Sequence, residues 1–326
     1  MARRLSNVAA TPQTAIASPA TAATSNRVEG RRVTAAYLAL TKPRIIELLL
    51  VTTVPVMFAA AGGLPSLPTV IWTVLGGTLA AAGANVFNCL LDADIDAHMQ
   101  RTANRPTVTG DIGRKQALVF AISLSTASVL VLWWGANQLS AILAAAAIAS
   151  YVVGYTMLLK RRTAQNIVWG GIAGCFPVLI GWTAVSGRPS LAAWLLFALV
   201  FFWTPAHYWP LSVKYREDYR AAHVPMLGAI ADPSKVARSV LAYVAATTVT
   251  AIGYGLVADT GMMYWLVSSA AAVWFTLEGI GLWRSCREIG ASIDVIAARS
   301  MRVFHVSISY LALVFLAVGV DPFVSR

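Results

Sequence analysis

Apolar stretches of membrane-spanning length recur along this chain and limit the folds open to it more than any other feature. A stretch of about 20 apolar residues crosses the hydrocarbon core of a bilayer as a helix. Only 12% of the residues are charged, which is about half the share of a soluble domain. We therefore predict an all-α polytopic membrane protein with nine spans, at 45–62, 68–91, 116–134, 139–159, 166–185, 191–213, 236–257, 262–282 and 303–320.

Lysine and arginine residues fall almost entirely on one side of these spans. If the N-terminus lies inside, the inside segments hold 23 of the 25 basic residues, and only Arg188 and Arg326 lie outside. Basic residues accumulate on the cytoplasmic side of membrane proteins. We therefore predict that the N-terminus lies inside and the C-terminus outside. The net charge of +11 reflects this bias and does not indicate a nucleic-acid partner.

The first 35 residues differ in composition from the rest of the chain. They are rich in Ala, Thr, Ser and Arg and lack the apolar core of a signal peptide. We predict a disordered basic tail on the inside over 1–35 and one membrane domain over 36–326. A transit peptide is the alternative for the tail, because Glu29 is its only acid. The three cysteines form no motif and predict no disulfide.

A polar stripe lies at the inside end of the second predicted span. Asn88, Asp92 and Asp96 are each four residues apart, so a helix places them on one face, whereas Asp94 points to the opposite side. Carboxylates at a membrane face are costly unless they are paired, solvated or bound to a cation. Two carboxylates and an amide oxygen suit Mg²⁺, which also takes phosphate oxygens and water. The alternative is a solvated helix end without a site.

Several basic residues lie on the same side of the predicted bundle as the stripe. Arg101 and Arg105 follow it and have the fork geometry that binds phosphate. Lys160 begins a basic run after the fourth span, and Lys42 precedes the first span. Charges at these two places set topology in many membrane proteins, and without further context we favour that reading.

A second polar segment ends the sixth span. A helix would place His207, Lys214 and Asp218 on one face, although Pro210 leaves the register of that helix open. These side chains could line one wall of a cavity. His305 lies about one turn inside the ninth span, and an ionisable group within a span suggests function.

These segments resemble the UbiA superfamily of intramembrane prenyltransferases. The run Asn88-x-x-x-Asp92-x-x-x-Asp96 is similar to the first aspartate motif of that superfamily. The resemblance covers about residues 36–320 and is closest to the heme-directed members. It is carried by residues 41–45, 94–96, 101–106, 155–156, 159–163, 166–167, 170–171, 203–209, 217–219 and 304–311.

The resemblance implies a nine-helix bundle around a central cavity in which an allylic diphosphate reacts with an acceptor. The implied Mg²⁺ ligands are Asn88, Asp92, Asp96 and Asp218. The implied catalytic residues are Asp92, Asp96, Asp218 and His207. The implied substrate-binding residues are Arg101, Arg105, Lys160, Lys214, Lys42 and His305. Many superfamily members carry two aspartates in the second motif. Here Lys214 stands in the place of the first, which implies a direct contact with diphosphate.

The heme-directed members transfer a farnesyl group from farnesyl diphosphate to the vinyl group of protoheme IX and form heme O. The resemblance therefore implies heme, farnesyl diphosphate, Mg²⁺ and the lipid bilayer as partners, and a heme A-forming enzyme as a further one. It implies the cytoplasmic membrane of a bacterium, with the mitochondrial inner membrane as the alternative. His207 is the first candidate for binding heme or moving a proton.

Three other functions stay open at this point. A UbiA-type enzyme that prenylates an aromatic quinone precursor is the nearest, although 101–106 and 207–219 favour heme. A secondary transporter would carry its acids in broken helices at mid-membrane, whereas these acids lie at one face. A passive heme-binding scaffold would not need the polar stripe.

Overall fold

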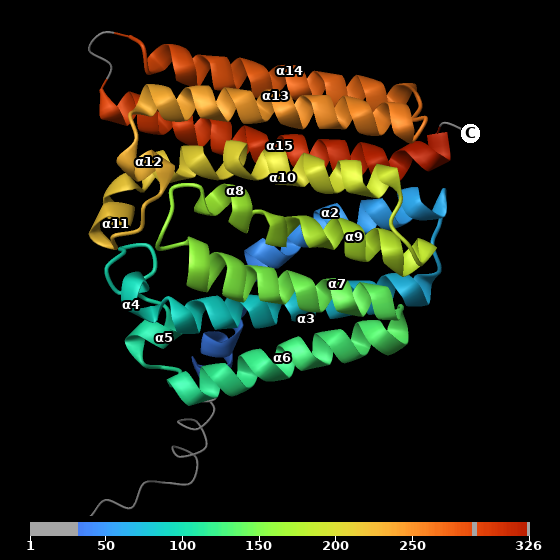
Figure 1. The fold of residues 1–326 in the computed structure, drawn as a ribbon, viewed down its shortest axis with the longest axis horizontal. Coiled ribbons are helices and arrows are strands. Elements are labelled where there is room, and N and C mark those ends of the chain that lie inside the picture. Colours follow the sequence, from blue (N-terminus) through green and yellow to red (C-terminus); the bar gives the residue numbers. More distant parts are fainter. Residues whose placement is uncertain (1–31, 289–291, 325–326) are drawn as a thin grey trace, which may run out of the picture.

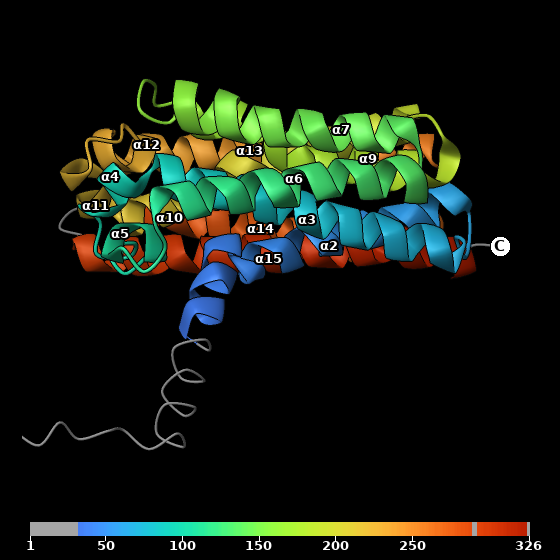
Figure 2. The ribbon, with the colours of Figure 1, turned by 90° about the horizontal axis from the view of Figure 1, so that it is seen from below.

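The computed structural model describes residues 32–288 and 292–324 and is helical in each of its regular elements there (Figure 1). The expected tail over 1–35 lies mostly outside the described residues, and 32–41 form a helix that projects from the side of the bundle (Figure 2). Tyr37 of this helix packs edge-on against Phe120, with ring centroids 4.9 Å apart. Leu40 and Thr41 at its end are buried, so this helix is anchored to the bundle.

Nine spans of the described chain are long and apolar enough to cross a membrane, which confirms the predicted number. They are α2 (Pro43–Ala61), α3 (Leu67–Leu91), α6 (Arg114–Gly135), α7 (Gln138–Ala149) continued by η1 (Ser150–Leu159), α8 (Asn166–Gly170) with α9 (Ile172–Ser186), α10 (Leu191–Lys214), α13 (Pro233–Val257), α14 (Met262–Ser285) and α15 (Ile293–Val324). The shorter helices are α4 (Ala93–Asp96), α5 (Pro106–Thr109), α11 (Arg216–Ala221) and α12 (Leu227–Ile230).

The predicted spans match these helices to within a few residues, except at the ninth. Helix α15 begins at Ile293, ten residues before the predicted start at 303. The extra turns carry Arg299 and Arg302, which an apolar window excludes. Arg302 Nε lies 2.9 Å from Glu278 Oε1, so an ion pair joins this extension to α14.

The short helices gather at one end of the bundle. Figure 1 shows α4, α5, α11 and α12 together at that end, whereas α15 finishes at the opposite end. Helices α3 and α6 pack together on one side, and α10, α13, α14 and α15 pack on the other. Helix α2 joins the two groups, because it contacts both α3 and α15. The polar segments that follow α3 and α10 therefore reach the same region.

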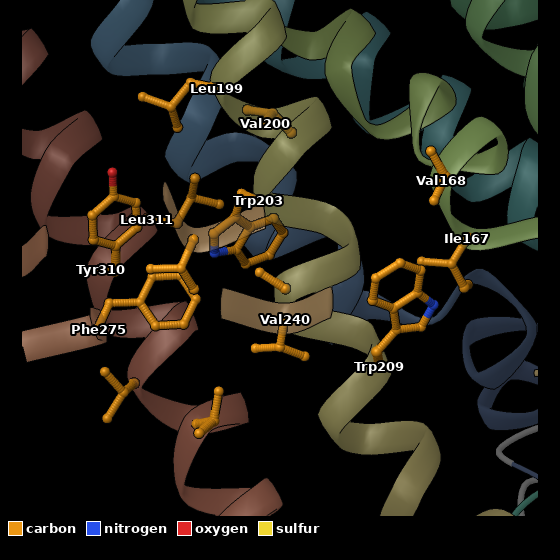
Figure 3. Packing of buried hydrophobic residues seen from close by; sticks show 14 of the residues in the cluster. Ile167, Val168, Leu199, Val200, Trp203, Trp209, Val240, Phe275, Tyr310 and Leu311 are labelled. Carbon is orange, nitrogen blue, oxygen red and sulfur yellow. The ribbon is translucent and has the colours of Figure 1, made fainter. Parts of the chain in front are cut away.

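Aromatic and branched side chains fill the space between α10, α13, α14 and α15. Figure 3 shows Trp203, Val240, Phe275 and Tyr310 in this cluster. Helix association in lipid depends on close packing and interhelical hydrogen bonds, since lipid tails are as apolar as leucine. Trp203 Nε1 supplies such a bond, because it donates to the backbone oxygen of Ser307 at 2.7 Å.

Two local features place polar groups at the end where the short helices lie. The fourth span changes to a π-helix in η1, and the Lys160 amide donates to the Tyr155 carbonyl five residues back at 2.9 Å. Helix α10 continues through Pro205 and Pro210 to Lys214, which settles the register left open by the sequence. Helix α10 ends before Tyr215, so Asp218 lies on the separate helix α11.

Candidate active site

The polar stripe of Asn88, Asp92 and Asp96 continues across a break between two helices. Helix α3 ends at Leu91, Asp92 has φ −94° and ψ 3°, and α4 begins at Ala93. The backbone ladder nevertheless continues, because the Asp92 amide donates to the Asn88 carbonyl at 2.9 Å and the Asp96 amide donates to the Asp92 carbonyl at 2.8 Å. Asn88, Asp92 and Asp96 are all buried. Carboxylates are seldom buried unless they are paired, so the two aspartates require partners.

Helix η1 supplies the partners of Asp92 and Asn88. Lys160 Nζ donates to Asp92 Oδ2 at 2.5 Å. Asn88 Nδ2 donates to the same oxygen at 2.6 Å and also lies 3.1 Å from Thr156 Oγ1. Thr156 in turn donates to the Tyr151 carbonyl at 3.0 Å, five residues back. The wide turns of η1 therefore deliver one hydroxyl and one ammonium group to the stripe.

A second ammonium group reaches the stripe from the start of α2. Lys42 Nζ donates to Asn88 Oδ1 at 2.7 Å. Burial is the largest influence on this group and lowers the pKa of Lys42 to about 8. Asn85 Nδ2 donates to the Thr41 carbonyl at 2.9 Å, which fixes the segment before α2 against α3. Asn85 thus holds Lys42 in place.

Arg105 pairs with the last carboxylate of the stripe. Its Nη1 donates to Asp96 Oδ2. The loop between them is held by Thr102, whose hydroxyl donates to the Asp96 carbonyl at 3.0 Å. Each aspartate of the stripe therefore pairs with a basic side chain.

Asp94 points away from the site, as the helical spacing predicts. Its carboxylate accepts two hydrogen bonds of 2.6 Å from Arg161, which hold the pKa of Asp94 at about 2. Arg161 Nη2 also donates to the Leu91 carbonyl at 3.1 Å and lies 3.8 Å from Asp92 Oδ1. Lys160 and Arg161 thus contact Asp92 and Asp94, and topology alone does not account for this basic run.

Arg101 joins the first loop to the second. Its guanidinium lies over the Tyr215 ring, 5.6 Å from the centroid. Burial favours the uncharged form, but Tyr208, Tyr219, Tyr215 and Asp96 outweigh it and raise the pKa of Arg101. The hydroxyls of Tyr208 and Tyr219 are 3.1 Å apart. Arg101 and these tyrosines therefore connect the loop after α4 with the end of α10 and with α11.

The charged residues of the second loop are less enclosed than the stripe. Lys214 is exposed at the end of α10, and Asp218 is half-buried on α11. In the described chain neither side chain has an ion-pair partner within 4 Å, whereas both aspartates of the stripe do. Lys214 and Asp218 are therefore available to a substrate without first breaking an ion pair of their own.

His207 lies on α10 between two aromatic rings. Trp203 and Phe304 stack on its faces, with centroids 4.3 and 4.5 Å away. His207 Nδ1 lies 2.7 Å from Ser307 Oγ, and Ser307 donates its hydroxyl proton to the Phe304 carbonyl at 2.6 Å. The imidazole must therefore donate from Nδ1, which leaves the Nε2 lone pair free. His305 is exposed on α15.

The stripe fits a divalent cation that brings a diphosphate with it. Asp92 Oδ1 is buried and accepts no hydrogen bond from the described residues. Across the same part of the chain, no three His, Cys, Asp or Glu side chains converge as a complete metal site. Mg²⁺ binds through one or two carboxylates when phosphate oxygens and water complete its coordination. Asp92 and Asp96 meet that requirement, and Asn88 would have to exchange its bond with Lys42.

An apolar cavity of about 150 Å³ lies beside the stripe. Asn85 and Tyr151 mark its polar end, three residues from Asn88 and five from Thr156. Helices α2, α3, α7, η1 and α9 line it with these residues: Ile45, Ile46, Leu49, Leu50, Thr53, Gly77, Ala80, Ala81, Ala84, Asn85, Ala147, Ile148, Tyr151, Ala173, Gly174, Pro177 and Ile180. The cavity thus runs from a charged group into the bundle.

Sequence reasoning gave no role to Thr156 or Tyr151. Thr156 belongs to a segment that resembles the family, but nothing in its spacing points to Asn88. The contact depends on the π-helix, and nothing in the sequence of η1 distinguishes it from an ordinary membrane helix. Buried cations and carboxylates over an apolar cavity define an intramembrane enzyme for a substrate with an anionic head and an apolar tail.

The chain belongs to the UbiA prenyltransferase family, whose profile matches residues 49–289. It is 53% identical to the protoheme IX farnesyltransferase of Paenarthrobacter aurescens (strain TC1), over 89% of each chain. It is 51% identical to the protein of that name from Renibacterium salmoninarum, over 89% of this chain and 90% of the relative.

The fold is also similar to solved structures at low sequence identity. One is a UbiA homolog from Archaeoglobus fulgidus bound to GPP and Mg²⁺, with TM-score 0.64 and 19% identity over 86% of this chain and 99% of that one. Another comes from work on digeranylgeranylglyceryl phosphate synthase, with TM-score 0.71 and 15% identity over 89% and 99%. The nine-span bundle is therefore a UbiA fold.

Proposed function

We propose that this protein transfers a farnesyl group from farnesyl diphosphate to a vinyl group of protoheme IX and forms heme O. The observation that carries the proposal is the pair Asp92 and Asp96, each buried and matched by a cation, at the mouth of an apolar cavity. The acceptor is supported by relatives of about 50% identity that carry the name protoheme IX farnesyltransferase.

The cations of the site bind the diphosphate. Lys42, Lys160 and Arg105 converge on the stripe from three different elements. Charge-assisted hydrogen bonds from such groups are stronger than neutral ones, and the apolar surroundings strengthen them further. Lys214 and Arg101 add charge from the second loop, where Lys214 replaces an aspartate of the wider superfamily.

Asn88, Asp92 and Asp96 would hold Mg²⁺ between the stripe and the diphosphate, with Asp218 as a further ligand from the facing loop. When bound, the metal neutralises the leaving group, as metals do in phosphoryl chemistry. The UbiA homolog solved with GPP and Mg²⁺ supports this assignment. Asp92 Oδ1 is the oxygen best placed for it, since it has no hydrogen-bond donor.

The reaction separates charge in a dry environment. The bond between the farnesyl C1 carbon and the diphosphate oxygen breaks, and the electron pair leaves with the diphosphate. The π electrons of the heme vinyl group then form the new carbon–carbon bond to C1. Water adds to the resulting cation beside the porphyrin and loses a proton, which gives a hydroxyethylfarnesyl side chain. The apolar cavity protects the farnesyl cation from premature attack by water.

His207 is the residue we assign to the heme side. Its ring is fixed by stacking and by Ser307, and its Nε2 lone pair faces no hydrogen-bond donor among the described residues. Such an atom suits an iron ion or a proton in transfer. His305 lies two residues before Ser307 on α15 and is the second candidate for the heme side.

We also infer that the site opens to the cytoplasm of a bacterium. The positive-inside rule places the N-terminus and both polar loops on that side. Farnesyl diphosphate has a soluble head and a lipid tail, so it can enter from the interface. A heme A-forming enzyme would be the next protein to act on the product.

One assay tests the proposal. The purified protein in lipid nanodiscs receives heme, farnesyl diphosphate and Mg²⁺, and the heme is analysed by mass spectrometry. We expect a heme heavier by one farnesyl group and one hydroxyl group, and no such product with EDTA. Prenylation of an added quinone precursor, with unchanged heme, would point to the aromatic-acceptor alternative.

A further inference from the structure

We propose that Gly77, Thr53 and Ile180 form the floor of the apolar cavity and set the length of the isoprenoid chain that the protein accepts. This inference rests on the proposed function, because it takes the cavity as the place of the prenyl tail. It goes further by assigning chain-length selection to particular residues.

The cavity has a polar mouth and an apolar interior. Asn85 and Tyr151 lie at the mouth, next to the residues that bind the diphosphate. From there the lining continues along α3 through Ala84, Ala81 and Ala80, which are all small. A substrate held by its diphosphate at the stripe would extend its tail along this wall.

The floor lies where α2 and α9 come together. A Cβ atom on Gly181 would lie 2.7 Å from the Thr53 carbonyl oxygen, so the two backbones are in contact there. Ile180 is buried next to this contact. Thr53, Gly77 and Ile180 are the lining residues of α2, α3 and α9 that lie farthest along their helices from the polar mouth. The lining therefore ends at this level.

Two glycines of the lining border empty space. A Cβ atom added to Gly77 or Gly174 would meet no atom within 4 Å. Gly76 and Gly181 are different, because a Cβ atom on either would clash with a neighbouring helix. A larger side chain at Gly77 would thus enter the cavity and leave the helix packing intact.

The depth of the cavity suits a chain of intermediate length. Eight residues of α3 separate Gly77 from Asn85, which is about 12 Å along the axis, and Asn88 lies one turn beyond. A chain of three isoprene units fits this depth when its head lies at the stripe. A shorter chain leaves the floor empty, and a longer one meets Thr53 and Ile180.

The test compares binding of three chain lengths without heme. Thiolodiphosphate analogues of geranyl, farnesyl and geranylgeranyl diphosphate are titrated with Mg²⁺ into the nanodisc protein by calorimetry. Gly77→Leu should weaken farnesyl binding relative to geranyl by roughly tenfold or more, and Ile180→Ala should favour geranylgeranyl over farnesyl by a similar factor.

Gly281→Leu is the matched control. A Cβ there also meets nothing within 4 Å, but Gly281 lies on α14 away from the cavity, so the order of affinities should not change. Equal weakening of all three analogues by Gly77→Leu, or no change in their order, would overturn the proposal. A wild-type protein that binds farnesyl best but forms no heme O would instead contradict the proposed acceptor, because this binding assay contains no heme.

Discussion

Lys160 Nζ lies 2.5 Å from Asp92 Oδ2, across 68 residues of sequence and at the junction of two helices. The Asp92 side chain is fully buried, and the Lys160 side chain is nearly so. An ion pair in such surroundings is costly to desolvate and contributes little to stability, but removal of one partner leaves an uncompensated buried charge. The pair is therefore better explained by the charged substrate that it is arranged to bind.

Substitution of Asp92 by asparagine should abolish most turnover, and it should also lower stability because Lys160 loses its buried partner. The side chain keeps its size, but one metal ligand loses its charge. We expect heme O formation to fall at least about 100-fold, as when a single electrostatic group of an active site is removed. Heme O is measured by mass spectrometry and the fold by gel filtration. Turnover close to wild type would exclude Asp92 as a metal ligand.

Arg105 and Arg161 should differ in their effect on substrate binding, although both pair with an aspartate. Arg105 neutralises the buried Asp96, whereas the Asp94 side chain that Arg161 binds is 62% exposed. We expect Arg105→Ala to raise the KM for farnesyl diphosphate roughly 10- to 100-fold, and Arg161→Ala to change it only a few-fold. Steady-state kinetics at saturating heme measures both, and equal effects would contradict a specific role for Arg105.

The heme spectrum should depend on His207. If Nε2 contacts the iron, His207→Ala shifts the Soret band of the bound heme, and Ser307→Ala changes it less because the imidazole keeps its place between the two rings. His305→Ala, at the second candidate, should shift the band less than His207→Ala does. An identical spectrum for His207→Ala would limit this residue to proton transfer or packing.

Substitution of Gly170 by alanine should destabilise the fold. The new Cβ would lie 2.2 Å from Cδ2 of Tyr155, and Tyr155 is itself buried and stacked on Tyr151 with centroids 5.6 Å apart. Overpacking of this kind costs about 1–3 kcal/mol, so Tm in detergent should fall. A Cβ on Gly154, in the π-helix η1 that carries Tyr155, meets nothing within 4 Å, so Gly154→Ala should not lower Tm.

Cys286 offers a test of orientation. Burial, and to a lesser degree Asp232, raises the pKa of this thiol to about 11. The thiol is protonated at pH 8, so labelling by maleimides should be slow there and accelerate as the pH rises towards 11. Cys89 and Cys175 are buried and should not react.

In intact cells an impermeant maleimide should label an Arg188→Cys variant and not Cys286. The reverse pattern would invert the predicted topology.

Spans and the stripe are predictable because they depend on composition and on short spacing. The positions of Asn88, Asp92 and Asp96 needed only a period of four residues, and that period persists across the break at Asp92. Asp94 was also placed correctly on the other side. Long-range partners are different, since Lys160 meets Asp92 only after the fourth span has packed against α3.

The other features of the fold and of the site depend on backbone geometry that cannot be predicted from the residue types. Nothing in the apolar run before Lys160 predicts a π-helix, and proline at 210 suggested an interruption that packing overrides. The face expected to carry both His207 and Asp218 is divided at Tyr215, because the helix ends there. Helix α15 begins before its apolar stretch, and an ion pair between Arg302 and Glu278 stabilises the added turns.

The π-helix makes one stretch of this chain sensitive to length and tolerant in composition. Its bonds span five residues where an α-helix spans four, so the loss of a single residue within Ser150–Leu159 would favour an ordinary helix. Each residue of an α-helix turns about 100°, and the ammonium group at its end would rotate away from the carboxylate. A substitution along the lipid face of this segment would therefore leave the site in place, whereas an insertion or deletion there would separate its two halves.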